Sequence, residues 1–319
     1  MSSPRVSILL PTLNAEDSIE RSVRSLLNQT YDNFEVFVLD SNSTDKTAQI
    51  VNQIDDDRLV FLDCGDRNLP ESLNYGARCA GGEYLARQDA DDWSDPERIA
   101  TQVQYLEDHE DVGLVGCFAS LVGLTKKPQR WTSLTEPTVD DLQEQMCFMG
   151  GALMMRADVF SEVEGYDEHF LIAEDYDIIL RIAALTGVRN IPEILYEYTV
   201  STDGLYAGNL SEAKLYHMVA RRRSVQGELP NGLLTEVKTT GVECVYEILT
   251  DAELSYYHAE MAQESLRFGR LADSRYHSRM ALRYDIAVYP LLIFILSLFG
   301  NTFVRIFVTQ YRRYKNYTQ

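Results

Sequence analysis

The segment Glu83-Tyr84-Leu85-Ala86-Arg87-Gln88-Asp89-Ala90-Asp91-Asp92 decides the fold, because a short apolar run ends there in three carboxylates within four residues. Carboxylates this close repel one another, and proteins commonly use them to hold a divalent cation and the anion that it neutralises. The run is predicted to be a strand over residues 83–88, and the helix start Asp95-Pro96 follows it. The sequence therefore predicts an acidic site at the end of a strand.

Outward from this segment, short β-branched runs alternate with amphipathic helical stretches, which is the pattern of a parallel sheet covered on both faces. Strands are predicted over residues 6–10, where Pro11 ends the run, and over 34–39, 59–62, 83–88 and 112–118. Helices are predicted after Asn14, which is suited to cap one, after Asp45, over 70–80 and over 96–106. An irregular loop is expected over 125–139. The predicted fold class is α/β, with a doubly wound, mostly parallel sheet.

Ligands of open α/β sheets bind beyond the carboxyl ends of the strands, so the segments that follow three strands should share one crevice. These segments are Pro11-Thr12-Leu13-Asn14, Asp40 and Asp89-Ala90-Asp91-Asp92. Asp40 is suited to accept hydrogen bonds from a base N–H, although it also fits the start of a turn. The 11–14 turn offers backbone groups to the same base.

Other residues fit either a binding role or a structural one. Gly150-Gly151 suits a place where the backbone approaches a bound sugar or acceptor, and it equally suits a turn. Arg78 is suited to pair with a diphosphate, and it equally suits the protein surface. Glu174-Asp175-Tyr176-Asp177 opens an apolar helix, where carboxylates also favour the positive end of the helix.

The composition narrows the possible partners. The 319-residue chain has a formal charge of −20 from 49 acidic and 29 basic residues. A nucleic-acid binder needs a basic stripe, so nucleic acid is not an expected partner. A dense acidic surface keeps a protein hydrated in high salt, and we expect a halophilic source. Five scattered Cys without a C-x-x-C pair favour reduced thiols in the cytosol.

The C-terminal part of the chain differs from the rest. Residues 206–285 are expected to form a helical appendage with a looser connection over 224–240. Residues 286–304 carry no charge, and four basic residues follow before the chain ends at residue 319. This contrast favours contact with an anionic membrane surface. Basic residues on both sides of the apolar segment favour an in-plane or re-entrant insertion over a single span. A helix buried against the first domain is the alternative.

Four segments, in order, resemble the motifs of the family 2 glycosyltransferases, which have the GT-A fold. They are Val6-Ser7-Ile8-Leu9-Leu10-Pro11-Thr12-Leu13-Asn14, Val38-Leu39-Asp40-Ser41-Asn42-Ser43-Thr44-Asp45, Gln88-Asp89-Ala90-Asp91-Asp92 and Ala173-Glu174-Asp175-Tyr176-Asp177. The resemblance implies a nucleotide-sugar domain over residues 1–205, with a donor most typically of the UDP type. In the family, Asp40 and the 11–14 turn read the base. Residues 206–285 and 286–319 would follow as the appendage and a membrane-associated tail.

The same resemblance assigns roles in the reaction. Asp91 is the ligand for Mn²⁺ or Mg²⁺, which neutralises the leaving diphosphate as a Lewis acid, and Asp89 faces the ribose or the diphosphate. Asp92 supports the turn. An acceptor hydroxyl is a poor nucleophile and needs a base opposite the leaving group, and Asp175 occupies the family position of that base. Glu174 orients the acceptor or Asp175, and a single displacement inverts the anomeric configuration.

Two departures from the family pattern refine this expectation. Many members carry a His after the Glu-Asp motif that helps to bind the metal, whereas residues 196–202 contain none. Metal binding is then weaker or is completed by water. The Gln-x-x-Arg-Trp motif of processive members is also absent, since Gln129-Arg130-Trp131 comes before the Glu-Asp motif with the wrong spacing. We therefore expect one sugar per encounter.

The predicted function is an inverting glycosyltransferase at the cytoplasmic face of the cell membrane. It would move one sugar to a lipid-linked saccharide or a polyprenyl phosphate, for surface glycans or glycoproteins. One alternative is a non-catalytic, nucleotide-binding subunit of a glycan assembly complex. Another is a sugar-phosphate nucleotidyltransferase, although that class opens with a Gly-rich loop where this chain has Pro11-Thr12-Leu13-Asn14.

Overall fold

The computed structural model describes residues 5–123, 127–200, 209–227, 229–267, 270–285 and 288–298. The chain divides into two compact units. The first comprises Met1–Gly208 with Ala220–Leu229, and the second comprises Asn209–Val219 with Pro230–Gln319. The domain boundaries predicted at residues 205 and 286 lie outside the described residues, as does the basic tail beyond residue 298.

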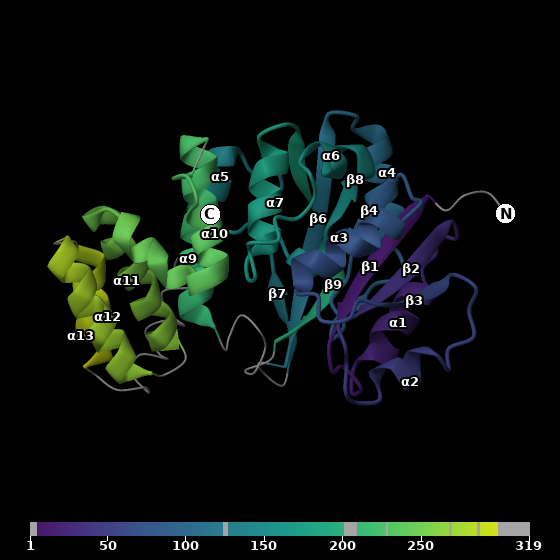
Figure 1. Cartoon of the computed structure of the whole chain (residues 1–319), viewed down its shortest axis with the longest axis horizontal. Coiled ribbons are helices and arrows are strands. Elements are labelled where there is room, and N and C mark those ends of the chain that lie inside the picture. Colours follow the sequence, from purple (N-terminus) through teal and green to yellow (C-terminus); the bar gives the residue numbers. More distant parts are fainter. Residues whose placement is uncertain are drawn as a thin grey trace. The chain divides into compact units, whose positions relative to one another are not determined.

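The first unit is built on one mixed sheet (Figure 1). The strand order is β3-β2-β1-β4-β8-β6-β9-β5, and β7 pairs with β6. The bounds are β1 Val6–Thr12, β2 Phe34–Asp40, β3 Leu59–Asp63, β4 Tyr84–Arg87, β5 Trp93–Ser94, β6 Val112–Val122, β7 Gln129–Trp131, β8 Met154–Arg156 and β9 Gly187–Thr199. Strands β1 to β4 run parallel, whereas β8 is antiparallel to both β4 and β6. The predicted α/β class is confirmed, and the half of the sheet beyond β4 is mixed.

Strand β1 continues through Pro11, so the prediction that Pro11 ends the strand is wrong. Pro11 pairs with Leu39 of β2. In a strand between two parallel neighbours, the main-chain groups of successive residues form hydrogen bonds alternately with one neighbouring strand and with the other. The main-chain oxygen of Leu9 accepts a hydrogen bond from the amide of Gln88, on the β4 side, at 3.0 Å. Pro11 faces the same side, but β4 has ended at Arg87. The N–H that proline lacks therefore has no strand partner to lose.

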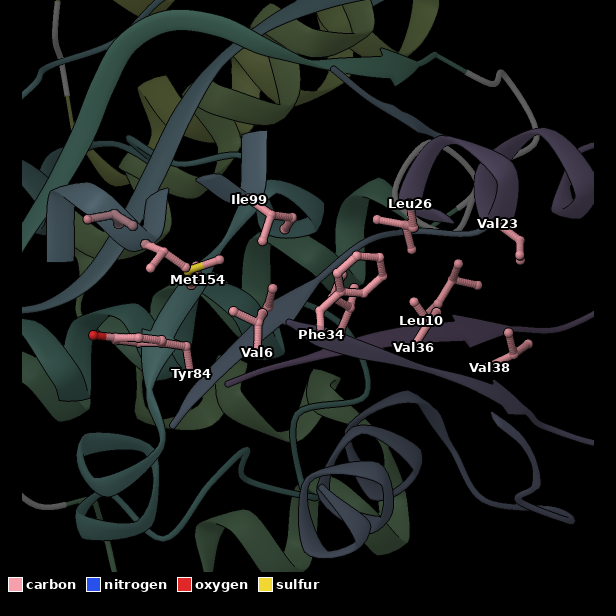
Figure 2. Close-up of a cluster of buried hydrophobic side chains, with 14 of the residues drawn as sticks. Val6, Leu10, Val23, Leu26, Phe34, Val36, Val38, Tyr84, Ile99 and Met154 are labelled. Carbon is pink, nitrogen blue, oxygen red and sulfur yellow. The ribbon is translucent and has the colours of Figure 1, made fainter. Parts of the chain in front are cut away.

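Helices cover both faces of the sheet. The helices of the first unit are α1 Ile19–Leu27, α2 Thr47–Val51, α3 Leu69–Cys79, α4 Arg98–Asp108, α5 Val139–Glu144, α6 Ala157–Glu162 and α7 Glu174–Ala183. Figure 2 shows Val23 and Leu26 of α1 beside Leu10 and Val36, which belong to the buried cluster on one face. On the other face, α3 comes so close that a methyl group on Gly76 would touch Leu39 and Leu9.

Several local expectations are corrected by the structure. Asn14 does not cap α1, which begins at Ile19 without a side-chain cap. The loop expected over 125–139 contains β7, and the looser connection expected over 224–240 contains the helix α10, Leu233–Thr240. Strands β8 and β9 were not predicted, because β8 has three residues and β9 carries Pro192 and Glu193 among its apolar positions. These elements lack the long apolar runs that made β1 to β4 visible.

The second unit is helical, as predicted for the appendage. Its elements are the start of α9 Leu210–Gln226, then α10, the 3₁₀ segment Val242–Ile248, α11 Asp251–Arg267, α12 Leu271–Tyr284 and α13 Val288–Ser297. Ile293 of α13 packs with Ala262 and Leu266 of α11. Within the described part of the chain, no helix has both the length and the apolar character needed to cross a membrane.

Candidate active site

The register of the sheet aligns the ends of the first strands along one edge. Thr12 pairs with Asp40, and Asp40 pairs with Asp63, so β1, β2 and β3 end at the same level. Arg87 at the end of β4 pairs with Leu9. Asp89 follows two residues later and therefore reaches the same edge.

Asp40 and the 11–14 turn belong to two loops that hold each other. The buried carboxylate of Asp40 accepts hydrogen bonds from the amide of Ser43 at 3.0 Å and from its hydroxyl at 2.5 Å. Asn14 has a φ of 51° and accepts a hydrogen bond from the amide of Thr44 at 2.9 Å. Thr12 Oγ1 is buried and has no hydrogen-bond partner within the residues described. Asp40 thus supports a turn, and Thr12 leaves a buried hydroxyl unengaged at the strand end.

Asp92 fastens the acidic turn to strand β9. One carboxylate oxygen accepts a hydrogen bond from the Tyr196 hydroxyl at 2.7 Å, and the other accepts one from the amide of Thr199 at 2.7 Å. The hydroxyl of Thr199 donates to the main-chain oxygen of Asp91 at 2.6 Å. Burial, and then the charges of Asp89 and Asp91, raise the pKa of Asp92. The turn is therefore fixed by its hydrogen bonds to β9, while the side chain of Asp91 stays exposed.

Arg87 links this turn to the helix α7. Its Nε donates to Asp89 at 2.8 Å, and its Nη1 donates to Glu174 at 2.8 Å. Arg87 and Glu174 are both buried. Burial lowers the pKa of Arg87, but the carboxylates of Asp89 and Glu174 raise it well above its ordinary value. The guanidinium therefore stays charged and joins the two acidic motifs.

Asp175 lies in the first turn of α7, directly after Glu174. Its Oδ1 accepts a hydrogen bond from the amide of Tyr176 at 2.7 Å. Burial raises the pKa of Asp175, and the nearby guanidinium of Arg87 opposes the rise. Ala173, which precedes the helix, has a φ of 64°, a left-handed conformation that costs an alanine about 1 kcal/mol. A raised carboxyl pKa brings the group closer to the pH at which a general base works best.

Two glycines leave room for the carboxylates. A methyl group on Gly150 would overlap Oδ2 of Asp175, and one on Gly151 would overlap the Tyr196 hydroxyl and press on Asp89. Both glycines belong to the short 3₁₀ turn Gly150–Ala152. The main chain of this turn therefore lies between the acidic turn after β4 and the base on α7.

The model for "Glycosyl transferase family 2" matches residues 7–163. EpsE of Bacillus subtilis strain 168, described as a glycosyltransferase, is 31% identical over 235 residues, which cover 69% of this chain and 84% of that protein. The chain belongs to glycosyltransferase family 2.

Other relatives of this family 2 glycosyltransferase are matched over shorter parts. An uncharacterized glycosyltransferase of Haemophilus influenzae is 30% identical over 210 residues, 61% of this chain and 65% of that protein. The chain thus spans just under two thirds of the length of that relative. WfaP of Escherichia coli, a UDP-Glc:alpha-D-GlcNAc-diphosphoundecaprenol beta-1,3-glucosyltransferase, is 34% identical over 105 residues, 32% of this chain and 41% of that protein.

Two solved structures share the GT-A fold with this glycosyltransferase. TarS 1-349 of S. aureus in complex with UDP-GlcNAc aligns with a TM-score of 0.59 at 16% identity, over 90% of this chain and 89% of that one. The mannosyltransferase PcManGT of Pyrobaculum calidifontis, in complex with GDP-Man and Mn²⁺, aligns with a TM-score of 0.56 at 18% identity, over 93% and 88%. The predicted family and fold are both confirmed.

The donor set of this glycosyltransferase fits a cation that is partly bound by substrate. Among the described residues, no three His, Cys, Asp or Glu side chains form a metal site by themselves. Mg²⁺ and Mn²⁺ at nucleotide sites usually take one or two carboxylates, with phosphates and water completing the shell. The exposed Asp91 can provide one such ligand, and Asp89 a second oxygen. Desolvation, and then the charge of Asp89, raise the pKa of Asp91, and a cation would relieve this repulsion.

Three residues of the site escaped sequence reasoning. Arg87 was a charge inside an apolar run, and that charge was the available signal. Arg98 of α4 is fully buried, and its Nη1 donates to the main-chain oxygens of Arg87 and Gly151 at 3.2 and 3.1 Å. Tyr196 lies in the segment that was searched for a His, and its ring lies 5.3 Å from the Arg98 guanidinium.

Arg78 does not join the other predicted site residues. It lies exposed in the last turn of α3, just before the chain enters β4. The next residues meet the start of β1, where the amide of Gly82 donates to the Ser7 hydroxyl at 2.9 Å. Arg78 is therefore at the amino-terminal edge of the sheet, opposite the edge that carries Asp40 and Asp89.

Proposed function

We propose that this family 2 glycosyltransferase transfers one sugar, with inversion, from a nucleotide-diphosphate sugar to a lipid-linked saccharide or a polyprenyl phosphate. The observation that carries the proposal is the chain of contacts Asp89–Arg87–Glu174, which ends beside Asp175. It joins an acidic turn suited to a diphosphate with a half-buried carboxylate suited to a base. The presence of carboxylates at both ends of this chain of contacts favours an enzyme over a non-catalytic subunit.

Asp175 would act as the base of a single displacement. Its carboxylate takes the proton of the acceptor hydroxyl while that oxygen bonds to the anomeric carbon. The bond from the anomeric carbon to the phosphate breaks, and its electron pair leaves with the nucleoside diphosphate. Because one oxygen replaces another on the opposite face, the configuration inverts. Glu174 holds Arg87, so its contribution is to fix Asp89 and the charge next to Asp175.

The nucleotide would bind at the ends of β1 and β2. Thr12 offers its unengaged hydroxyl there, and Asp40 keeps lone pairs beyond those used by Ser43. Complexes of the structural neighbours contain UDP-GlcNAc and GDP-Man, which supports a sugar nucleotide and leaves UDP as our first choice. A divalent cation held by Asp91, together with Asp89 and the phosphates, would supply Lewis-acid neutralisation of the leaving group.

The acceptor is proposed to be a lipid because the second unit carries an apolar face that is exposed among the residues described. Leu291, Leu292, Ile295 and Leu298 on or just after α13 are each more than 40% exposed. Positions 291, 295 and 298 follow the i, i+4, i+7 spacing of one helix face. WfaP acts on a diphosphoundecaprenol-linked sugar, which supports an acceptor of this kind.

Charge supports an anionic membrane as the place of action. Residues 275–319 contain seven basic residues and one acidic residue, which leaves 22 basic and 48 acidic residues for the rest of the chain. Exposed Arg279 and Arg283 of α12 belong to this basic part, and Arg279 lies 5.3 Å from the ring centroid of Phe294 on α13. Basic side chains beside an apolar face favour in-plane binding to anionic lipid at the cytoplasmic face. The acidic remainder supports a halophilic source and a role in surface glycan or glycoprotein synthesis in such a cell.

The experiment that tests the proposal measures nucleoside diphosphate release from UDP-glucose, UDP-GlcNAc and GDP-mannose, with a diphosphoundecaprenol-linked GlcNAc as acceptor. Each donor is assayed with Mn²⁺ and with a chelator. We expect acceptor-dependent release from one donor, a product extended by one sugar of inverted configuration, and loss of release with the chelator. A protein that binds nucleotide but releases no nucleoside diphosphate from any of the three donors would favour the non-catalytic alternative.

A further inference from the structure

Tyr198 of β9 lies on the same face of its strand as Tyr196. The pairing of β9 with β6 is regular here, with Ala119 opposite Tyr196 and Leu121 opposite Tyr198. In a strand, residues two apart point to the same side. Tyr196 reaches Asp92 and the main chain of Asp89, so Tyr198 points to the same side one repeat further along.

The surroundings of Tyr198 are those of the reaction centre. Tyr198, Met149 and Trp131 each pack against one small buried cluster, which includes Tyr196. Met149 directly precedes Gly150, the residue that lies against Asp175. Burial raises the pKa of the Tyr198 phenol, and the charges of Asp89, Asp92, Asp91 and Asp175 raise it further. The hydroxyl is therefore neutral, and its pKa is affected by carboxylates of both acidic motifs.

Tyr198 differs from its neighbours in what its hydroxyl does. Arg87 donates to Asp89 and Glu174, and Tyr196 donates to Asp92. The hydroxyl of Tyr198 has no hydrogen bond to any part of the chain that the structure describes. A phenylalanine would fill the same space, and a half-buried hydroxyl without a partner forfeits hydrogen bonds that water would give. The donor is thus free for a ligand.

We propose that the Tyr198 hydroxyl donates a hydrogen bond to the β-phosphate of the sugar nucleotide, the group that accepts the electron pair when the glycosidic bond breaks. This inference rests on the proposed function. The site is rich in carboxylates that repel a diphosphate, and among the described residues Arg87 and Tyr196 already donate to these carboxylates. Tyr198 lies on the strand face from which Tyr196 reaches the acidic turn, and Met149, the neighbour of the glycine that lies against Asp175, packs on the same cluster.

The test compares nucleotides that differ by one phosphate. Isothermal titration in the presence of Mn²⁺ measures binding of UDP and UMP, and of GDP and GMP, to the full-length protein and to Tyr198→Phe. We expect Tyr198→Phe to weaken binding of the diphosphate by about 10-fold, the usual scale for a hydrogen bond to a charged group, and to leave the monophosphate unchanged. The control is Tyr105→Phe, since Tyr105 packs near the same cluster but stacks on His109.

Each other result has a definite reading. Unchanged diphosphate binding in Tyr198→Phe overturns the inference and leaves the proposed function intact. Equal loss for the diphosphate and the monophosphate also overturns it, because the effect would not depend on the β-phosphate. If the unmodified protein binds neither UDP nor GDP, the proposed function fails and the inference fails with it. Circular dichroism of both variants shows that they fold.

Discussion

Arg87 donates from Nη1 to Oε1 of Glu174 at 2.8 Å, and this ion pair is buried between the end of β4 and the first turn of α7. The same guanidinium holds Asp89 through Nε. Arg87 and Glu174 are 87 positions apart in the sequence. The acidic turn and the helix that carries the base thus both depend on the guanidinium of Arg87.

Removing the guanidinium of Arg87 should destabilise the fold. Arg87→Met leaves Glu174 buried without a partner, and breaking a buried pair from one side costs about 3–5 kcal/mol. The double variant Arg87→Met/Glu174→Leu should recover part of the loss, because no buried charge remains unpaired. Urea denaturation measures both. Arg24→Met is the control, since its pair with Glu20 is exposed and should contribute about 0–1 kcal/mol. Equal costs for Arg87→Met and Arg24→Met would contradict this account.

Asp175→Asn should separate catalysis from binding. The amide keeps the shape of the side chain but cannot take a proton, so the turnover rate should fall by roughly 10²- to 10⁴-fold. Binding of UDP in the presence of Mn²⁺ should persist. Asp177→Asn is the contrast, because Asp177 pairs with Arg181 and Arg223 and is expected to lower stability with little effect on the turnover rate. A fully active Asp175→Asn variant would remove Asp175 as the base.

The stability of the protein should fall as the pH rises when no divalent cation is present. The pKa values of Asp91, Asp92 and Asp175 are raised, in each case first by the loss of water around the carboxylate, which is partial for the exposed Asp91. Between the ordinary carboxyl range and these raised values, the folded state holds protons that the unfolded chain has lost, so ionisation works against folding. A cation that binds the ionised carboxylates should reduce the fall.

The measurement is the melting temperature between about pH 4 and pH 8, with a chelator and with Mn²⁺. In an Asp91→Asn variant, the melting temperatures measured with the chelator and with Mn²⁺ should no longer differ. Identical pH slopes with and without Mn²⁺ in the unmodified protein would count against cation binding at the acidic turn.

Replacing the exposed apolar face of α13 should weaken binding to membranes. Leu291→Glu/Ile295→Glu places two charges on that face, and co-sedimentation with vesicles that contain phosphatidylglycerol should decrease. Val225→Glu is the matched control, because Val225 is an apolar side chain, 61% exposed, on a different helix, α9. Vesicles of phosphatidylcholine alone should bind less, since the basic part of the chain contributes attraction only to anionic lipid. Equal binding of all three proteins would show that α13 is not the contact.

The early strands could be predicted because buried parallel strands are written as continuous apolar runs. Residues 6–10, 34–39 and 59–62 lie within β1, β2 and β3, and only the ends moved. β8 and β9 were missed because their residues find their place through pairing with β4, β5 and β6, which is a long-range property. The acidic turn at 89–92 was visible for the opposite reason, since three carboxylates after an apolar run are rare in ordinary turns.

The residues that hold the site together were less accessible to sequence reasoning. Glu174 and Asp175 were found through a motif, but the partner of Glu174 is Arg87 in a strand far along the chain. Nothing in residues 196–202, which contain no His, marks Tyr196 as a site residue, although its hydroxyl is the group that fixes Asp92. Arg78 was chosen for its charge alone, and α3 carries it to the other edge of the sheet. The charge of a side chain can be read from the sequence, whereas the edge of the sheet at which it lies can be read only from the fold.

The two glycines of the 3₁₀ turn have a consequence for the gene. Positions 150 and 151 face Asp175 and Tyr196 so closely that any codon other than glycine would displace one of them. Gly81, where an added methyl group meets only ordinary contact with Glu35, carries no such restriction. In a saturation library selected for transferase activity, codons 150 and 151 should stay glycine while codon 81 drifts, so that the spacing of the reaction centre is inherited as two adjacent GGN triplets.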